Sequence, residues 1–431
     1  MAKYQAPRGT RDLLPTQKAR WQRLDALASD LGERYGYRPI ETPMFEDSAV
    51  FERAIGEATD VVEKELFRIV SPADEKPRWA LRPEATAGIV RAYVEHGMQT
   101  LPQPVRVSTF GPMFRYDRPQ AGRFRQFWQW NVEAIGDPGP AIDAEIIELG
   151  LRFLREAGAP TVEVHLNSIG DRACRPAYVG ALSDYLAARH DELPPVERAR
   201  ASISPLRVLD SKDPNLAALI AAAPLIGDYL CAACRQHYAD LRRHLDVLGV
   251  PVREAPRIVR GLDYYTRTTF EYFVPGAEGS QQALGGGGRY DGLVELLGGR
   301  PTPGIGFAIG IDRVAAVTEA RDSGAAPGRP AAVIVGADPA ATEVRLRIAT
   351  ELRAAGIAAT AELGTRKLAR QLEGAAREGA HFAVVIGDEL EAGHVQLRDL
   401  EAGTQKVIHV DGLAREIERA QGSHRHGSSV P

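Results

Sequence analysis

The stretch that most constrains the fold of this chain is Phe114–Gly136, which reads FRYDRPQAGRFRQFWQWNVEAIG. Its pattern predicts two β-strands joined by an arginine-rich turn. Successive side chains of a strand point to opposite faces, so the second strand would have one polar and one apolar face. The polar face carries Phe127, Gln129, Asn131 and Glu133, and the apolar face carries Trp128, Trp130 and Val132. Arg115, just before the turn, can share the polar face. We therefore expect a sheet with a packed back and a front that binds a ligand.

Length and composition are those of an ordinary globular protein of about three domains. The chain has 431 residues, of which 44% are hydrophobic and 26% are charged. A formal net charge of −4 argues against coating nucleic acid by bulk charge, although 53 lysines and arginines allow local basic patches.

The ends and apolar runs of the sequence predict neither export nor membrane insertion. The N-terminus, MAKYQAPRGTRDLLP, lacks the apolar core of a signal peptide. The best apolar run, Leu216–Cys234, is interrupted by Pro224 and cannot span a bilayer. Three cysteines, an odd number, do not make a disulfide framework. We expect a cytoplasmic protein that has no membrane partner.

The N-terminal third predicts helices that alternate with short extended segments. Lys18–Tyr35 has an apolar stripe at helical spacing, and Tyr37–Met44 continues as a strand. Two prolines in that strand favour a sheet edge or a subunit contact. Ala80–Gly97 begins extended and then predicts a helix, with Pro83 at its first position and Glu84 in its first turn.

The middle of the chain predicts an insertion within a first domain that spans residues 1–325. An alanine-rich helical block runs from about residue 170 to 248. The flanking segments, Val162–Leu166 and Ile258–Val274, have the composition of strands, so the block would interrupt one sheet.

Beyond the linker-like segment Glu319–Arg329, the pattern predicts a compact α/β domain over residues 330–420. Its expected strands are Ala332–Val335, Ala358–Ala361 and Phe382–Ile386, and its expected helices are Ala340–Ala355 and Lys367–Glu378. Residues 421–431 have the composition of a disordered tail.

The common phosphate-binding loops are absent from the sequence, so side chains would have to hold any nucleotide. Arginine suits this role because its planar guanidinium matches phosphate oxygens and stays charged. Arg115 ends the first strand, Arg260 opens RGLDYYTRTTFE, and Arg313 follows the glycine-spaced segment Gly304–Gly310. Each arginine alone fits a surface ion pair, whereas their joint occurrence favours a nucleotide site.

At these residues the chain resembles the class II aminoacyl-tRNA synthetases, and among them the histidyl-tRNA synthetase family. The segments that carry the resemblance, besides the opening run, are PRGTRDLLP (Pro7–Pro15), GYRPIETPMFE (Gly36–Glu46), LRPEATA (Leu81–Ala87), PLRVLDSK (Pro205–Lys212), RGLDYYT (Arg260–Thr266), GGGRYDGL (Gly286–Leu293) and GIGFAIGIDR (Gly304–Arg313). RGLDYYT is the segment that points to histidine. Ala85 and Asp312 stand where the family commonly has glycine and glutamate, and neither change removes a group needed for chemistry.

The resemblance implies an α+β fold in which an antiparallel class II sheet is flanked by helices. It also implies that the C-terminal α/β domain is an anticodon-binding domain. Gly36–Glu46 resembles the segment through which the family forms dimers, so we expect a homodimer.

The resemblance also implies a histidine site on the front of the sheet. Glu84, Thr86 and Gln129 would accept from the ammonium group, and the imidazole would lie between Glu133 and Tyr265. Tyr264 and Tyr290 would line the pocket; packed structural tyrosines are the alternative interpretation. The full histidine-binding set is Glu84, Ala85, Thr86, Arg115, Gln129, Glu133, Arg260, Tyr264, Tyr265 and Tyr290.

ATP would bind as the second substrate, accompanied by Mg²⁺ and without a tightly bound cofactor. By the resemblance, Phe127 and Arg313 would enclose the adenine, and Arg115 and Arg260 would bridge the histidine carboxylate and the α-phosphate. The ATP-binding residues are therefore Arg115, Phe127 and Arg313, and the catalytic residues are Arg115, Arg260 and Arg313. Catalysis would depend on alignment and on charge stabilisation.

The resemblance implies that the arginine-rich turn contacts tRNA-His. Arg118, Gln120 and Arg123 would meet the acceptor end, although a solvated charged loop explains the same residues without tRNA.

One group of cysteines invites a metal interpretation. Cys231 and Cys234 form a single C-x-x-C, with His237 nearby and Cys174 distant in sequence. A lone pair of this kind is a weak signal for zinc, and small buried cysteines also pack well on a helix. We assign no metal ligand from the sequence.

The resemblance implies a histidine–tRNA ligase that activates L-histidine with ATP and transfers it to the 3′ end of tRNA-His. The alternative is a catalytically silent, synthetase-like regulatory subunit of histidine biosynthesis. A nucleic-acid-binding module without chemistry is a third class, against which the acidic net charge counts.

Overall fold

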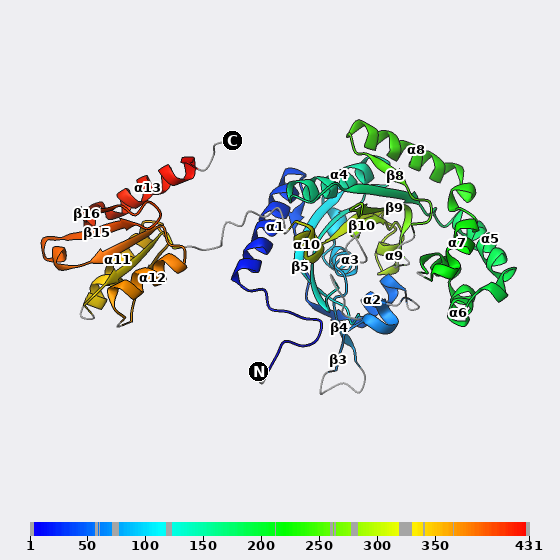
Figure 1. Cartoon of the computed structure of the whole chain (residues 1–431). Helices are drawn as coiled ribbons and strands as arrows, with labels where there is room; N and C mark the ends of the chain where they lie inside the picture. Colours follow the sequence, from blue (N-terminus) through cyan, green and yellow to red (C-terminus); the bar gives the residue numbers. More distant parts are fainter. Residues whose placement is uncertain are drawn as a thin grey trace. The chain divides into compact units, whose positions relative to one another are not determined.

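The computed structural model describes residues 4–56, 59, 61–70, 77–117, 123–211, 213–258, 262, 264–276, 283–318, 330–338, 341–364 and 366–427. The chain divides into two compact units, Met1–Ser323 and Gly324–Pro431, which are coloured from blue to yellow and from orange to red in Figure 1.

The first unit is built on an eight-stranded sheet that is antiparallel except for the parallel pairs β1·β5 and β7·β8 at its two edges. In spatial order its strands are β1 (Arg38–Pro39), β5 (Val105–Phe114), β6 (Gln126–Ile135), β11 (Gly304–Gly310), β10 (Ala283–Arg289), β9 (Thr266–Phe273), β7 (Glu163–Ser168) and β8 (Val252–Glu254). A second, small sheet consists of β2 (Phe45–Asp47), β4 (Trp79–Leu81) and β3 (Arg68–Ile69). The predicted proline-bearing strand is the edge strand β1, which pairs over only two residues.

The predicted two-strand motif is confirmed, because β5 and β6 pair antiparallel over their whole length. The back of β6 presents Trp130 and Val132 to a core that includes residues of α1 (Pro15–Arg34), α4 (Pro140–Glu156), α8 (Ala232–Val247) and α10 (Ile311–Thr318). Helices α2 (Ser48–Ile55), α3 (Thr86–Glu95) and α9 (Leu293–Leu296) contribute to a separate core that Phe127 of the front face joins. The two faces of this strand therefore differ as its alternating pattern indicates.

Two element boundaries differ from the sequence prediction. The helix expected to begin at Pro83 begins at Thr86, because the Glu84 carboxylate accepts from the first backbone N–H groups. The long strand expected over 258–274 is confined to Thr266–Phe273 among the described residues. Tyr264 and Tyr265 both enter the same buried cluster, which the alternation of a strand does not allow.

The helical insertion comprises α5 (Arg175–Ala187), α6 (Pro195–Ile203) and α7 (Ala217–Ala222), which surround a core of their own that runs from Cys174 to Cys234. Helix α8 was expected to belong to this block, but its Leu241 and Leu245 pack in the core behind the main sheet. No single helix of the described residues is long and apolar enough to cross a bilayer. The segments Pro214–Tyr229 and Ala232–Val247 pass that test only as a pair, which is bent by 99°.

The second unit has a five-stranded sheet in the order β13 (Ala359–Ala361), β12 (Ala332–Gly336), β14 (Phe382–Ile386), β15 (His394–Asp399) and β16 (Gln405–His409). The first three strands are parallel, as expected for an α/β module with α11 (Thr342–Ala354) and α12 (Leu368–Arg377). The sequence analysis missed the antiparallel strands β15 and β16. It also assigned residue 421 onward to a disordered tail, whereas α13 (Leu413–Gly427) continues to Gly427 and residues 428–431 lie outside the described residues.

Candidate active site

A cavity of about 780 Å³ opens on the front face of the large sheet. Eleven of the residues predicted to bind histidine, ATP or tRNA line it: Glu84, Thr86, Arg115, Arg123, Phe127, Gln129, Glu133, Tyr264, Tyr265, Tyr290 and Arg313. These residues come from segments spread over more than half of the chain, so their meeting is a result of the fold.

Four predicted residues are not placed in the cavity. Ala85 is fully buried at the start of α3, where it packs in the core rather than against the cavity. Arg118, Gln120 and Arg260 lie outside the described residues. Arg123, at the far end of the same turn, forms an ion pair with Asp117 at 2.9 Å.

Glu133 is the central polar group of the cavity floor. Its side chain is 1% exposed and accepts two hydrogen bonds of 2.6 Å, one from Thr86 Oγ1 and one from the Tyr290 hydroxyl. Burial raises the pKa of this carboxyl to about 8, against the lowering effect of the two hydroxyl donors. Sequence analysis expected Tyr265 opposite Glu133 and Tyr290 only as a lining residue. In the structure Tyr290 is a direct partner of Glu133.

The Glu84 side chain hydrogen-bonds the first backbone N–H groups of helix α3. Its two carboxylate oxygens accept from the backbone N–H of Thr86 at 2.7 Å and of Ala87 at 2.9 Å. Burial raises its pKa, and these backbone donors oppose that shift. A carboxylate has about four lone-pair sites, so two acceptor positions remain for a ligand's N–H groups.

A cluster of tyrosines forms one wall of the cavity. The rings of Tyr264 and Tyr265 have centroids 4.6 Å apart, and Tyr264 meets Tyr290 edge to face at 6.0 Å. Tyr264 and Tyr290 are buried, and burial raises the pKa of both phenols well above the ordinary value. The wall therefore presents neutral hydroxyl groups and ring faces to a ligand.

Two of the arginines that line the cavity, Arg115 and Arg313, are braced by backbone carbonyls. Arg115 donates from Nε to Pro83 O at 2.9 Å, and its guanidinium carbon lies 5.6 Å from the Phe127 ring centroid. Arg313 donates from Nη1 to Ala283 O at 2.7 Å, which braces it against strand β10. Both side chains are held by backbone carbonyls, so their charge is oriented before a ligand binds.

Glycines on the central strands make room for the side chains of the site itself. A Cβ on Gly306 would lie 1.8 Å from Glu133 Oε2, and one on Gly304 would lie 2.2 Å from the Tyr290 ring. A Cβ on Gly288 would lie 2.8 Å from the Tyr265 ring. Gly304 and Gly306 of β11 therefore leave the space that the Tyr290 ring and the Glu133 carboxylate occupy.

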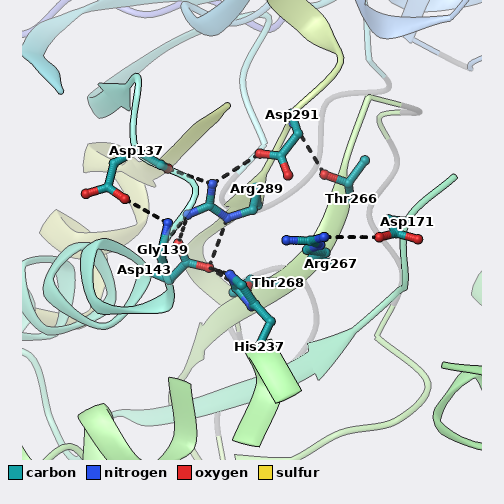
Figure 2. A network of polar contacts seen from close by, with 10 residues as sticks. All are labelled: Asp137, Gly139, Asp143, Asp171, His237, Thr266, Arg267, Thr268, Arg289 and Asp291. Atoms are coloured by element: carbon teal, nitrogen blue, oxygen red, sulfur yellow. Dashed lines mark hydrogen bonds and ion pairs between the residues drawn. The ribbon is translucent and has the colours of Figure 1, made fainter. Parts of the chain in front are cut away.

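The buried ion-pair network around Arg289, shown in Figure 2, was not predicted from the sequence. Arg289 is completely buried and pairs with Asp143, which is also completely buried, and with Asp291 at 3.1 Å. It donates further to Asp137 O and Gly139 O, both at 2.9 Å. Because Tyr290 is the next residue, this anchoring fixes the segment that supplies a partner to Glu133. A charged residue in a glycine-rich strand was the signal available in the sequence.

Asp312 was also missed as a positioning residue. Its carboxylate accepts from the backbone N–H of Trp128 and from Arg11 Nη2, both at 2.7 Å. The guanidinium of Arg11 in turn lies 4.0 Å from the Phe124 ring centroid. Asp312 therefore ties the N-terminal segment and the start of β6 to α10 at the rim of the cavity.

Comparison with known proteins gives one consistent answer. A family model described as histidyl-tRNA synthetase matches residues 9–314, and one described as an anticodon binding domain matches residues 331–420. The histidine–tRNA ligase of Desulforudis audaxviator is 44% identical over 414 residues, which cover 96% of this chain and 98% of that protein. That of Moorella thermoacetica is 43% identical over 404 residues, which cover 93% of this chain and 95% of that protein.

Among solved structures, apo histidyl-tRNA synthetase of S. aureus superposes with a TM-score of 0.80 at 34% identity, covering 96% of this chain and 99% of that one. The match extends through both units, including the strands that carry the cavity. The chain belongs to the histidyl-tRNA synthetase family.

Proposed function

We propose that this protein is a histidine–tRNA ligase. It activates L-histidine with ATP to histidyl-adenylate and pyrophosphate, and then transfers the histidyl group to the 3′ end of tRNA-His. The observation that carries the proposal is that Glu133, with its two hydroxyl partners, and the braced Arg115 and Arg313 line one cavity. This combination suits a ligand with a nitrogen-bearing ring beside a polyphosphate.

The histidine end of the cavity would select its ligand by paired polar groups. The ring N–H of histidine would donate to Glu133, and the ammonium group would donate to Glu84, Thr86 and Gln129. Such a site rejects analogues that lack the hydrogen-bonding atoms by about 10⁴-fold or more, because its own buried groups would be left unpaired.

In the first step, a histidine carboxylate oxygen attacks the α-phosphorus of ATP. A new carboxyl O–P bond forms, the bond from the α-phosphorus to the bridging oxygen breaks, and pyrophosphate leaves with that electron pair. Arg115 and Arg260 would stabilise the charge on the α-phosphoryl oxygens, and Arg313 would hold the distal phosphates and, with Phe127, the adenine. ATP would enter with Mg²⁺. Glu65 and Glu271 of the cavity wall offer the oxygen ligands that this ion prefers, and it would neutralise phosphate charge.

In the second step, a hydroxyl of the terminal ribose of tRNA attacks the carbonyl carbon of the adenylate. The new ester bond forms as the bond to phosphate breaks, AMP leaves, and the hydroxyl proton passes to the phosphate or to solvent. Arg118, Gln120 and Arg123 would contact the acceptor end. Residues 331–420, which match the anticodon-binding model, would bind the other end of tRNA-His.

The assembly is proposed from exposed side chains, and the setting from the cysteines. We infer a homodimer formed through Gly36–Glu46, since Met44 and Phe45 there are 50% and 54% exposed. Sedimentation of the full chain as a monomer at micromolar concentration would contradict this.

We also infer a cytoplasmic setting, in which the free thiols of the chain stay reduced. Recovery of the protein only from secreted fractions would contradict it.

Charging of tRNA-His with radiolabelled histidine, measured beside histidine-dependent exchange of pyrophosphate into ATP, tests the function. A ligase shows both activities, whereas a regulatory subunit shows neither. We expect Arg115→Ala to lower exchange by about 10²-fold, the usual loss for one oriented charge donor. The control Arg243→Ala removes a 67% exposed arginine from α8 and should leave exchange unchanged. Exchange near the wild-type rate in Arg115→Ala would remove this arginine from the mechanism.

A further inference from the structure

All three cysteines of the chain meet at the base of the helical insertion. Cys174 is the N-cap residue of α5, Cys231 is the N-cap residue of α8, and Cys234 lies in the first turn of α8. Asp171 joins them from three positions before Cys174. The four potential ligand atoms all lie within 4.8 Å of one another.

The separations between these atoms match a tetrahedral metal site. The sulfurs of Cys174 and Cys234 are 3.7 Å apart, and Asp171 Oδ1 lies 3.5 Å from Cys174 Sγ. Zinc bonds of about 2.3 Å to sulfur and about 2.0 Å to oxygen would separate tetrahedral ligands by about 3.8 Å and about 3.5 Å respectively. A disulfide would require sulfurs about 2.05 Å apart. The cluster is therefore spaced to share one small cation.

The surrounding backbone is shaped to hold these ligands. Cys174 and Cys234 are 4% and 1% exposed, and Asp171 Oδ1 accepts from the backbone N–H of Ala173 at 3.0 Å. Gly170 adopts φ +67°, and a Cβ there would lie 2.7 Å from Cys174 Sγ. Only glycine suits both this conformation and this close approach.

His237, which the sequence grouped with these cysteines, belongs elsewhere. Its Nε2 lies 3.6 Å from Asp143 in the Arg289 network. The fourth residue of the cluster is instead Asp171, which was not predicted from the sequence. Three thiolates and one carboxylate in a tetrahedron favour zinc over magnesium or calcium, which require more oxygen ligands.

We propose that Asp171, Cys174, Cys231 and Cys234 bind a structural zinc ion that joins the helical insertion to the catalytic sheet. Four protein ligands close the coordination sphere, so the ion has no open position for a substrate. The ion would therefore take no direct part in the reaction proposed above.

Contacts around the cluster show what the ion would hold together. Asp171 Oδ2 accepts from Arg267 at 3.2 Å (Figure 2), which orients the carboxylate from outside, as partners of metal ligands commonly do. The backbone N–H of Arg267 donates to Gly170 O, and Arg267 O accepts from the backbone N–H of Ile169, both at 2.7 Å. Arg175, in the first turn of α5, donates to Tyr265 O at 3.0 Å. The zinc site would thus support the wall of the cavity to which Tyr265 belongs.

Metal analysis of the untagged full-length protein tests the proposal directly. We expect about one zinc per chain after dialysis against metal-free buffer, because closed thiolate sites bind zinc tightly. Substitution with Co²⁺ should give the intense visible bands of tetrahedral thiolate coordination. Chelation at raised temperature should lower the melting temperature, and added zinc should restore it.

Two variants distinguish the ligand set. Asp171→Asn and Cys234→Ser should each lose most of the zinc, whereas His237→Gln should retain it. Wild-type protein with no zinc and three thiols that titrate freely would overturn the proposal, as would a disulfide that removes two thiols from the titration. Retention of zinc in Asp171→Asn, with loss in His237→Gln, would overturn the assigned ligands. Because the metal content and the cobalt spectrum of the wild type need no variant, poor folding of a variant leaves the test intact.

Discussion

At the scale of single residues, Glu133 has the most unusual environment in the cavity. Its carboxyl is buried, which makes ionisation unfavourable. The hydrogen bonds from the two hydroxyl groups offset only part of that free-energy cost. Its pKa of about 8 lies well above the ordinary 4.5, so near neutral pH the folded protein holds a proton that the unfolded chain does not. The stability that this proton provides is fully present below pH 4.5 and is lost as the pH rises through about 8.

Glu133→Gln should therefore change the pH dependence of stability. The amide does not titrate, so the free energy of unfolding of the variant, relative to that of the wild type, should increase between pH 4.5 and about 8 and then level off. Urea unfolding at a series of pH values measures this difference. The same variant should lower histidine-dependent pyrophosphate exchange, because one of the two acceptor oxygens is replaced by an NH₂ donor and the polar groups around it are mispaired.

A matched control for this prediction is Glu418→Gln, which removes an exposed carboxylate from α13. A stability difference between Glu133→Gln and the wild type that stays constant with pH would show that Glu133 does not titrate as its burial implies.

At the scale of elements, the central strands β10 and β11 are rich in glycine, so they add little side-chain volume to the sheet. Glycine at alternate positions of β11 leaves space above the sheet, and Glu133 from the neighbouring strand β6 fills part of it. The backbone on both sides is fixed by antiparallel pairing, so an added methyl group cannot be accommodated by a shift of the strand.

Gly306→Ala should therefore disrupt the site from within the sheet. The new Cβ would lie 1.8 Å from Glu133 Oε2 and 2.5 Å from Val132 O. We expect destabilisation of about 1–3 kcal/mol from overpacking, and at least about a tenfold fall in histidine-dependent exchange as Glu133 is displaced. Denaturant unfolding and exchange kinetics measure the two effects.

Gly180→Ala in α5 provides the control for the glycine prediction, since nothing lies within 4 Å of the added Cβ. In a helix interior this change should stabilise by about 0.5–1 kcal/mol and leave exchange unaltered. Normal exchange in Gly306→Ala would mean that Glu133 is not needed in its present position.

At the scale of the whole molecule, the two units have separate hydrophobic cores. The clusters around the large sheet lie within the first unit, and those around β12 and β14 lie within the second. Domains with their own cores commonly unfold as separate cooperative units.

Calorimetry of the full chain should accordingly show two unfolding transitions. The first unit contains the cavity. L-histidine with a non-hydrolysable ATP analogue should therefore raise the melting temperature of the first unit's transition and leave that of the second unchanged. At ligand concentrations 100-fold above the dissociation constant, the stabilisation should be about 2.7 kcal/mol. A single transition, or an equal shift of both, would show that the units unfold together.

The sequence by itself determined those features that depend on local pattern. Alternation along Gln126–Ile135 predicted which side chains face the front of the sheet, and the spacing after Pro330 predicted three strands and two helices of the second unit. The family segments predicted the residues of a histidine site, since each segment can be recognised within a few residues. Local pattern missed β15 and β16, a hairpin whose first strand pairs with β14.

Only the tertiary structure decided which distant groups meet. Glu133 lies 47 residues from Thr86 and 157 from Tyr290, and Cys174 lies 60 from Cys234. Periodicity reports the face on which a side chain lies but not its partner, because partners are chosen when separate elements pack into one core. The burial of Arg289, the pKa of Glu133 and the entry of Asp171 into the cysteine cluster all arise from that packing.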